Sequence, residues 1–179
     1  SFVQIDFFLS FIYHQIHFLL YLYLCVSDFM LPRLSNVPQL NNVVSDYLSE
    51  LQKQHFEGDI ASNYADRLSL ATDNSVYQQL PQAILFPKSV ADVVRITKLA
   101  NKEKYLHLTF TPRGGGTGTN GQSINNNIIV DLSRHMTGIL ELNIEERWVR
   151  VQAGVVKDQL NQFLKPHGLF FAPELSTSN

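Results

Sequence analysis

The feature that most constrains this chain is a glycine-rich stretch in its middle, residues 114–121. It holds five of the nine glycines in the sequence and directly follows Pro112 and Arg113. Glycine lets the backbone take positive φ and approach a ligand closely, and successive N–H groups in a tight loop form a concave anion site. The stretch has almost no side chain to bury, so we expect it to lie outside the core and to bind phosphate.

Two familiar nucleotide-binding motifs share letters with this stretch. Three of its glycines have the G-x-G-x-x-G spacing of the dinucleotide-binding fingerprint, which requires a helix to begin inside it. Residues 122–127 are instead turn-rich, and residues 128–131 have the apolar pattern of a strand. A Walker loop requires Lys and then Ser or Thr after its last glycine, where this chain has Gln122 and Ser123. The sequence therefore predicts a strand–loop–strand unit that binds phosphate through backbone N–H groups.

Helical and strand patterns lie on both sides of the loop. Ser89 and Asp92 resemble a capping box at the start of a helix. Apolar residues at helical spacing occur in 40–51, 90–100 and 155–164, and strand patterns occur in 83–86, 106–110, 128–131, 139–142, 148–153 and 169–171. Strands that alternate with helices indicate a fold that mixes both.

Composition excludes several classes of protein. A length of 179 residues, 45% of them hydrophobic and 17% charged, suits about one globular domain. The net charge of −2 gives no electrostatic case for nucleic acid. The single cysteine, Cys25, allows no internal disulfide and no cysteine metal site. No histidines or carboxylates have metal-ligand spacing, so we expect no metal site here.

The first 29 residues differ from the rest of the chain. They hold six of the twelve Phe and three of the seven Tyr, with no Lys or Arg. A secretory signal needs a basic start, and a membrane-spanning helix needs about 20 apolar residues, which His14, Gln15 and His17 interrupt. We interpret residues 1–29 as a non-native extension before Met30, a translated upstream stretch or a gene-annotation error. A membrane anchor is the alternative.

Sequence motifs around the glycine loop resemble a known family. The loop with its preceding Pro112 and Arg113 is similar to the pyrophosphate loop of the PCMH-type FAD-binding domain of the vanillyl-alcohol oxidase superfamily. The motifs that carry this resemblance occupy residues 87–94, 112–118, 129–134, 151–155 and 172–174. The resemblance implies an α+β fold, the N-terminal part of such a domain, with a small mixed sheet, flanking helices and a truncated C-terminus.

A narrower resemblance covers residues 30–179. They are similar to the N-terminal part of the large bacterial FAD- and iron–sulfur-binding D-2-hydroxyglutarate dehydrogenases of the YdiJ type, through residues 64–68, 157–162 and 174–179. This implies that the intact parent uses FAD to oxidise a D-2-hydroxyacid like 2-hydroxyglutarate. Its catalytic residues, substrate cap and iron–sulfur cluster would follow this sequence. We therefore assign no catalytic residue and expect the fragment alone to be inactive.

The resemblance also implies a division of the chain and a location. Residues 1–29 would be the extension, 30–82 an N-terminal helical segment, and 83–179 the first part of the FAD-binding domain, incomplete at its C-terminus. We expect a cytoplasmic protein, at most peripheral to the inner membrane, with membrane contact only if residues 1–29 are real. A non-redox phosphate- or nucleotide-binding module and a non-functional truncated product are the alternatives.

The cofactor-binding residues follow from the same resemblance. Arg113 would either neutralise the pyrophosphate or form a structural ion pair. Residues 176–179 would approach the ribityl chain or the flavin. The residues expected to bind FAD are Arg113, Gly114, Gly115, Gly116, Thr117, Gly118, Thr119, Asn120, Gly121, Pro173, Ser176, Thr177, Ser178 and Asn179.

Overall fold

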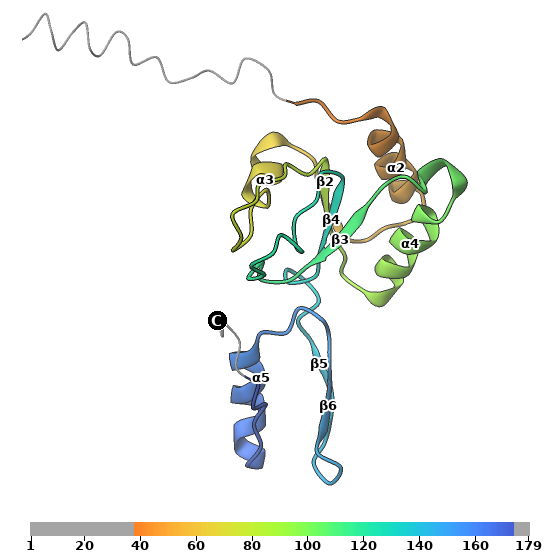
Figure 1. The fold of residues 1–179 in the computed structure, drawn as a ribbon. Coiled ribbons are helices and arrows are strands. Elements are labelled where there is room, and N and C mark those ends of the chain that lie inside the picture. The colour runs from red at the N-terminus through yellow and green to blue at the C-terminus, as the bar shows by residue number, and fades with distance from the viewer. Residues whose placement is uncertain (1–37, 174–179) are drawn as a thin grey trace, which may run out of the picture. The chain divides into compact units, whose positions relative to one another are not determined.

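The structure is a computed structural model of the chain and describes residues 38–173 (Figure 1). The interpretation of residues 1–29 and the expected FAD contacts of residues 176–179 lie outside this range. The described elements are α2 (Asn42–Lys53), β1 (Asp59–Ala61), α3 (Tyr64–Ser69), β2 (Ala83–Phe86), α4 (Val90–Ala100), η1 (Glu103–Tyr105), β3 (Phe110–Arg113), β4 (Ile128–Asp131), β5 (Ile139–Asn143), β6 (Trp148–Val151), α5 (Lys157–Leu164) and η2 (Lys165–His167).

A four-stranded sheet with the strand order β1-β2-β4-β3 organises residues 59–131. β2, β4 and β3 run parallel, and β1 pairs antiparallel with β2. The carboxyl ends of the three parallel strands meet at one edge of the sheet, which is where ligands bind in open α/β sheets. The glycine loop begins at this edge, directly after Arg113. The predicted α+β fold with a small mixed sheet and flanking helices is confirmed.

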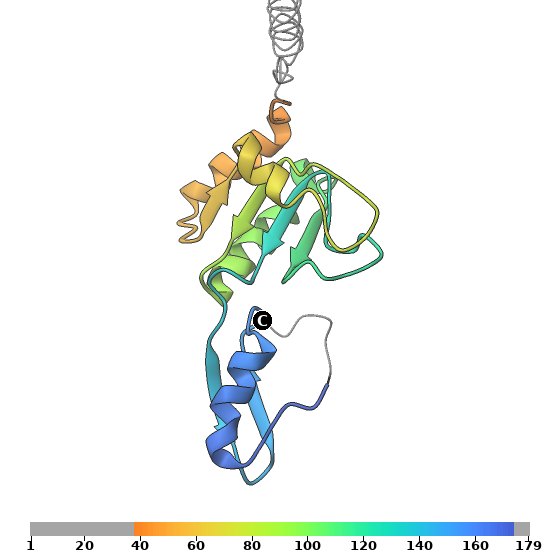
Figure 2. The ribbon, with the colours of Figure 1, turned by 90° about the vertical axis from the view of Figure 1, so that its left-hand side faces the viewer.

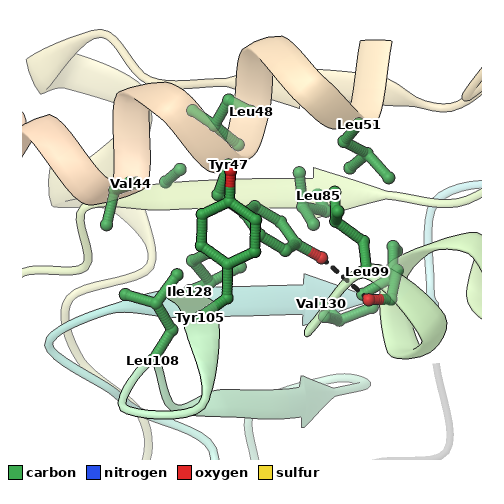
Figure 3. Packing of buried hydrophobic residues seen from close by; sticks show 12 residues of the cluster. Val44, Tyr47, Leu48, Leu51, Leu85, Leu99, Tyr105, Leu108, Ile128 and Val130 are labelled. Carbon is green, nitrogen blue, oxygen red and sulfur yellow. Dashed lines mark hydrogen bonds between the residues drawn. The ribbon is translucent and has the colours of Figure 1, made fainter. Parts of the chain in front are cut away.

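One face of the sheet is covered by α2 and α4 (Figures 1 and 2). Burial of the apolar stripe of α2 explains why its residues recur at helical spacing. Tyr47 lies at the centre of this core, where its hydroxyl donates a hydrogen bond of 2.9 Å to the carbonyl of Ile96 and its ring meets Tyr105 edge-on (Figure 3). The buried residues of this cluster are Val44, Tyr47, Leu48, Leu51, Ala83, Leu85, Ile96, Leu99, Tyr105, Leu108, Ile128 and Val130.

The other face of the sheet has a smaller apolar cluster. Ile84, Phe86 and Ile129 point to this side, because side chains alternate along a strand, and they pack against Ala61 and Leu70. α3 precedes Leu70 in the chain and contacts β2. This face therefore places the end of α3, and the segment that follows it, beside the sheet.

The start of α4 confirms the predicted cap. The Ser89 hydroxyl accepts a hydrogen bond from the N–H of Asp92. The carboxylate of Asp92 is fully buried and accepts from the backbone N–H groups of Lys88 and Glu57, both at 3.0 Å. Asp92 thus binds the backbone of Lys88, the residue before the N-cap, and also fixes Glu57 in the segment that leads into β1.

A hairpin and a helix follow the four-stranded sheet. β5 and β6 pair antiparallel, and the α5 helix that follows them buries Leu160 and Leu164. The N–H of Gly154 donates to the carbonyl of Met136 at 2.8 Å. A Cβ on Gly154 would lie 2.1 Å from the carbonyl oxygen of Leu132, so this close backbone approach requires glycine.

Several elements differ from the sequence prediction. The third strand of the sheet covers Phe110–Arg113 rather than 106–110, because its pairing with β4 begins at Phe110 opposite Ile128. The predicted strand 169–171 is irregular, since the Asn161 side chain bonds the backbone of Phe171 in place of a partner strand. β6 ends at Val151 and α5 begins at Lys157. No helix within 38–173 is both long and apolar enough to cross a membrane.

Candidate functional site

The glycine stretch forms a loop between β3 and β4, so the predicted strand–loop–strand unit is confirmed. Residues 122–127 hold turns and bends and no helix, which removes the dinucleotide-fingerprint reading. Gly116 and Gly121 have φ of +67° and +75°, a conformation that other residues rarely adopt. These two glycines are therefore required by the path of the loop itself.

Gly114 and Gly115 have a different reason to be glycine. A Cβ on Gly114 would meet no atom within 4 Å, and one on Gly115 would meet only the Thr117 methyl at 3.6 Å. Neither residue has a positive φ, and both are exposed. Nothing in the described fold excludes a side chain at these positions, so their glycines leave space for a group from outside the chain to reach the backbone.

The backbone of the loop offers unused hydrogen-bond donors. Within the described residues, none of the N–H groups of residues 114–119 donates to a protein acceptor, whereas the N–H of Asn120 bonds the Gln122 side chain at 2.9 Å. Successive free N–H groups in an exposed loop are the donor set that binds anions. The loop can therefore hold a phosphate without rearranging any bond of its own.

Arg113 lies against the loop rather than in an ion pair. Its guanidinium approaches the carbonyl oxygens of Leu70 at 3.5 Å and Ser123 at 3.4 Å. A Cβ on Gly116 would lie 2.3 Å from Nη2 of Arg113, so the guanidinium rests directly on that glycine. Arg113 has no carboxylate within ion-pair distance in residues 38–173. Its positive charge remains available beside the loop.

A depression of about 500 Å³ lies between the loop and the segment after α3. Figures 1 and 2 show that segment, in yellow-green, beside the green loop. The N–H of Asn74 donates to the carbonyl of Gly116 at 3.1 Å and joins the two. The residues that line the depression are Ser69, Thr72, Asp73, Asn74, Arg113, Gly116 and Thr117.

Asp73 is the acidic residue of this depression. Its carboxylate accepts hydrogen bonds from the N–H of Ser75 and the hydroxyl of Ser123, each at 2.9 Å. Hydrogen bonds from Ser75 first, and then from Ser123, lower the pKa of Asp73 to about 2. Asp73 is therefore ionised at neutral pH.

Sequence reasoning located the loop but missed residues 72–75. Their only sequence signal is the polar run Thr-Asp-Asn-Ser, in which Asp followed two residues later by Ser suits a local turn. Nothing in that run indicates that it contacts a loop more than 40 residues later.

The other predicted cofactor residues lie in different environments. Thr117 lines the depression and Gly118 packs against the Gln122 side chain, while Thr119 is exposed. Pro173 is exposed and lies in an irregular segment. Among the described residues, no three His, Cys, Asp or Glu side chains gather as metal ligands would.

Comparison with known proteins gives these features a context. The FAD binding domain family matches residues 81–179. The D-2-hydroxyglutarate dehydrogenase of Haemophilus influenzae is 83% identical over 150 residues, 84% of this chain and 15% of that protein. The Escherichia coli protein of the same name is 62% identical with the same coverage. This chain thus spans about 15% of the length of these curated relatives.

Solved structures share the fold at low sequence identity. Alkyldihydroxyacetonephosphate synthase superposes with a TM-score of 0.62 at 20% identity, over 74% of this chain and 27% of that protein. At that identity the match concerns the arrangement of helices and strands alone. The fold is therefore one that known proteins share.

Proposed function

This chain belongs to the FAD binding domain family, and from that premise we propose that its glycine loop holds the diphosphate of FAD in an enzyme that oxidises a D-2-hydroxyacid. The observation that carries the proposal is the open space at Gly114 and Gly115. These glycines are required neither by φ nor by packing, and they border free backbone N–H groups. A diphosphate in contact with the backbone would use both the space and the donors.

Arg113 supplies the charge that the loop lacks. A diphosphate brings two negative charges to a site whose N–H groups carry only partial positive charge. The Arg113 guanidinium has no carboxylate partner within the described residues and lies on Gly116. Charge-assisted hydrogen bonds to phosphate are about twice as strong as neutral ones. We infer that Arg113 both clamps the loop and attracts the diphosphate.

The reaction and its substrate come from the relatives. Their names state that they dehydrogenate D-2-hydroxyglutarate, and bound FAD would supply the redox chemistry, with the protein placing it. We infer a substrate of the same class, a small D-2-hydroxyacid with a carboxylate. We assign no catalytic residue among 38–173. An iron–sulfur cluster would need ligands beyond this sequence, because it has a single cysteine and such clusters take several.

A chimera tests the proposal as a whole. The 150 matched residues of the Haemophilus influenzae dehydrogenase are replaced with those of this chain, and flavin content and D-2-hydroxyglutarate oxidation are measured. We expect both to be retained. In the chimera, Gly115→Val should lower FAD affinity at least about tenfold, or 1.4 kcal/mol, since the valine fills the space left for the diphosphate.

Ala91→Val, on the exposed surface of α4, is the matched control and should leave both quantities unchanged. If the Gly115→Val chimera stays active and binds flavin normally, the loop does not belong to the cofactor site. A folded chimera that loads flavin but does not oxidise the hydroxyacid would contradict the assigned substrate class.

A further inference from the structure

We call the segment Thr72–Ser75 the arm. Its residues Thr72, Asp73 and Asn74 line the depression together with residues of the glycine loop. We propose that Asp73 of this arm is a positioning residue that holds the glycine loop in its phosphate-binding conformation. This inference rests on the proposed function of the loop, and it adds a part of the site that lies outside the glycine motif.

The arm holds the loop at two separated points. The N–H of Asn74 donates to the carbonyl of Gly116, inside the loop. The carboxylate of Asp73 accepts from the hydroxyl of Ser123, just after the loop ends at Gly121. Two contacts on either side of Gly118 restrict the loop without using its N–H groups as donors.

Ser123 contacts both Asp73 and Arg113 and so connects the arm to the guanidinium. Its hydroxyl bonds Asp73 while its carbonyl oxygen lies 3.4 Å from Nη1 of Arg113. Ser123 is buried, so its hydroxyl depends on a protein partner. Asp73, Ser123 and Arg113 form a chain of hydrogen bonds that ends at the guanidinium resting on Gly116.

The hydrogen bonds of the carboxylate favour a structural role for Asp73 over direct contact with the cofactor. An ionised Asp73 that faced a diphosphate would repel it. Each of its oxygens instead accepts a hydrogen bond from within the protein, Oδ1 from the N–H of Ser75 and Oδ2 from the hydroxyl of Ser123. The negative charge is therefore used as a strong acceptor within the protein.

Hydrogen exchange of the full chain without FAD tests the arm directly. Asp73→Ala should raise the amide exchange rates of Asn74 and Ile124 about tenfold, because their N–H groups donate to the loop carbonyls of Gly116 and Gly121 and these bonds open more often once the loop loses an anchor. Exchange in α2 and β4 should stay at the wild-type rate. Asp73→Asn should restore most of the protection, since its amide can still accept from Ser75 and donate to Ser123. Asp46→Ala, on the exposed surface of α2, is the control.

A second measurement separates this inference from the proposed function. FAD titration should give weaker binding to Asp73→Ala than to the wild type, with Asp73→Asn in between. If the wild type fails to bind FAD, the proposed function fails for this chain while exchange still decides the role of the arm.

Exchange of the Asn74 and Ile124 amides within twofold of wild type in Asp73→Ala would overturn the inference. If that variant unfolds as a whole, α2 and β4 also lose protection, and Ser123→Ala decides instead because it removes only one of the bonds. Unchanged exchange of the Asn74 and Ile124 amides in a folded Ser123→Ala variant would then overturn the inference.

Discussion

Arg67 lies at the junction of three segments and is only 2% exposed. Its Nε donates to the carbonyl of Pro81 at 2.7 Å and its Nη1 to the carbonyl of Pro38 at 2.8 Å. Burial lowers the pKa of the guanidinium, yet an arginine remains charged at any ordinary pH. The side chain thus ties the chain before α2 to the chain before β2 through two fixed donors.

Arg67→Lys should destabilise the fold although it keeps the charge. A lysine has one ammonium group and cannot place two donors in the fork geometry of a guanidinium, so a buried carbonyl loses its partner. We expect a loss of about 1–3 kcal/mol in the free energy of unfolding, measured by urea denaturation. Arg150 forms an exposed ion pair with Glu141, and Arg150→Lys should change the free energy of unfolding by less than about 0.5 kcal/mol. Equal effects of the two variants would contradict the role given to Arg67.

The role of a residue could be predicted from sequence where its partners lie a few residues away in the chain. The Ser89 cap depends on residues three apart, and the structure confirms it. Arg67 could not be recognised, because its acceptors lie 14 and 29 residues away and carry no side-chain signal. The same holds for Asp73, whose partner Ser123 is 50 residues distant.

At the scale of the elements, α2 is joined to η1 by polar contacts at the edge of the core. The carboxylate of Glu50 accepts a hydrogen bond of 2.8 Å from the Tyr105 hydroxyl and pairs with Lys102. The hydrogen bond from Lys102, and then that from Tyr105, hold the pKa of Glu50 below its ordinary value of 4.5. A carboxyl whose pKa is lower in the folded state contributes stability above its unfolded pKa.

The contribution of Glu50 should therefore disappear in acid. At pH 7, Glu50→Gln should be less stable than wild type. That difference should shrink as the pH falls below about 4.5 and the wild-type carboxylate takes up a proton. Denaturation curves at a series of pH values check this, with Glu57→Gln as the comparison. A difference that stays constant or grows toward low pH would contradict the assigned contacts.

The observed strand boundaries agree with those predicted from sequence where a strand is buried on both faces. β2 and β4 are short apolar runs, and both are found where they were predicted. β3 is shifted by several residues because it lies at the sheet edge, where its position depends on pairing with β4 rather than on its own apolar pattern. Leu106, Leu108 and Phe110 alternate along the sequence, which made residues 106–110 look like a strand. In the structure Leu106 is exposed, and Leu108 is buried from the irregular segment between η1 and β3.

At the scale of the whole molecule, the site lies where three parallel strands end and where two distant segments meet. The glycine loop could be predicted, because residues without side chains are visible directly in the sequence, whereas its phosphate ligand is our proposal. The arm could not, because the bond from Asn74 to Gly116 exists only once β2, β3 and β4 are paired. The sheet therefore assembles a depression that neither segment would form alone.

Glycine amide signals in ¹⁵N NMR report whether the loop N–H groups hold the diphosphate of FAD. We expect FAD titrated into the chain to shift the signals of Gly114, Gly115, Gly116 and Gly118. The signals of glycines outside the loop, such as Gly58 and Gly168, should stay unmoved as internal references. Two results would contradict binding of FAD by the loop. One is shifted signals of Gly58 and Gly168 with unshifted loop signals, and the other is no shift of any glycine signal at saturating FAD.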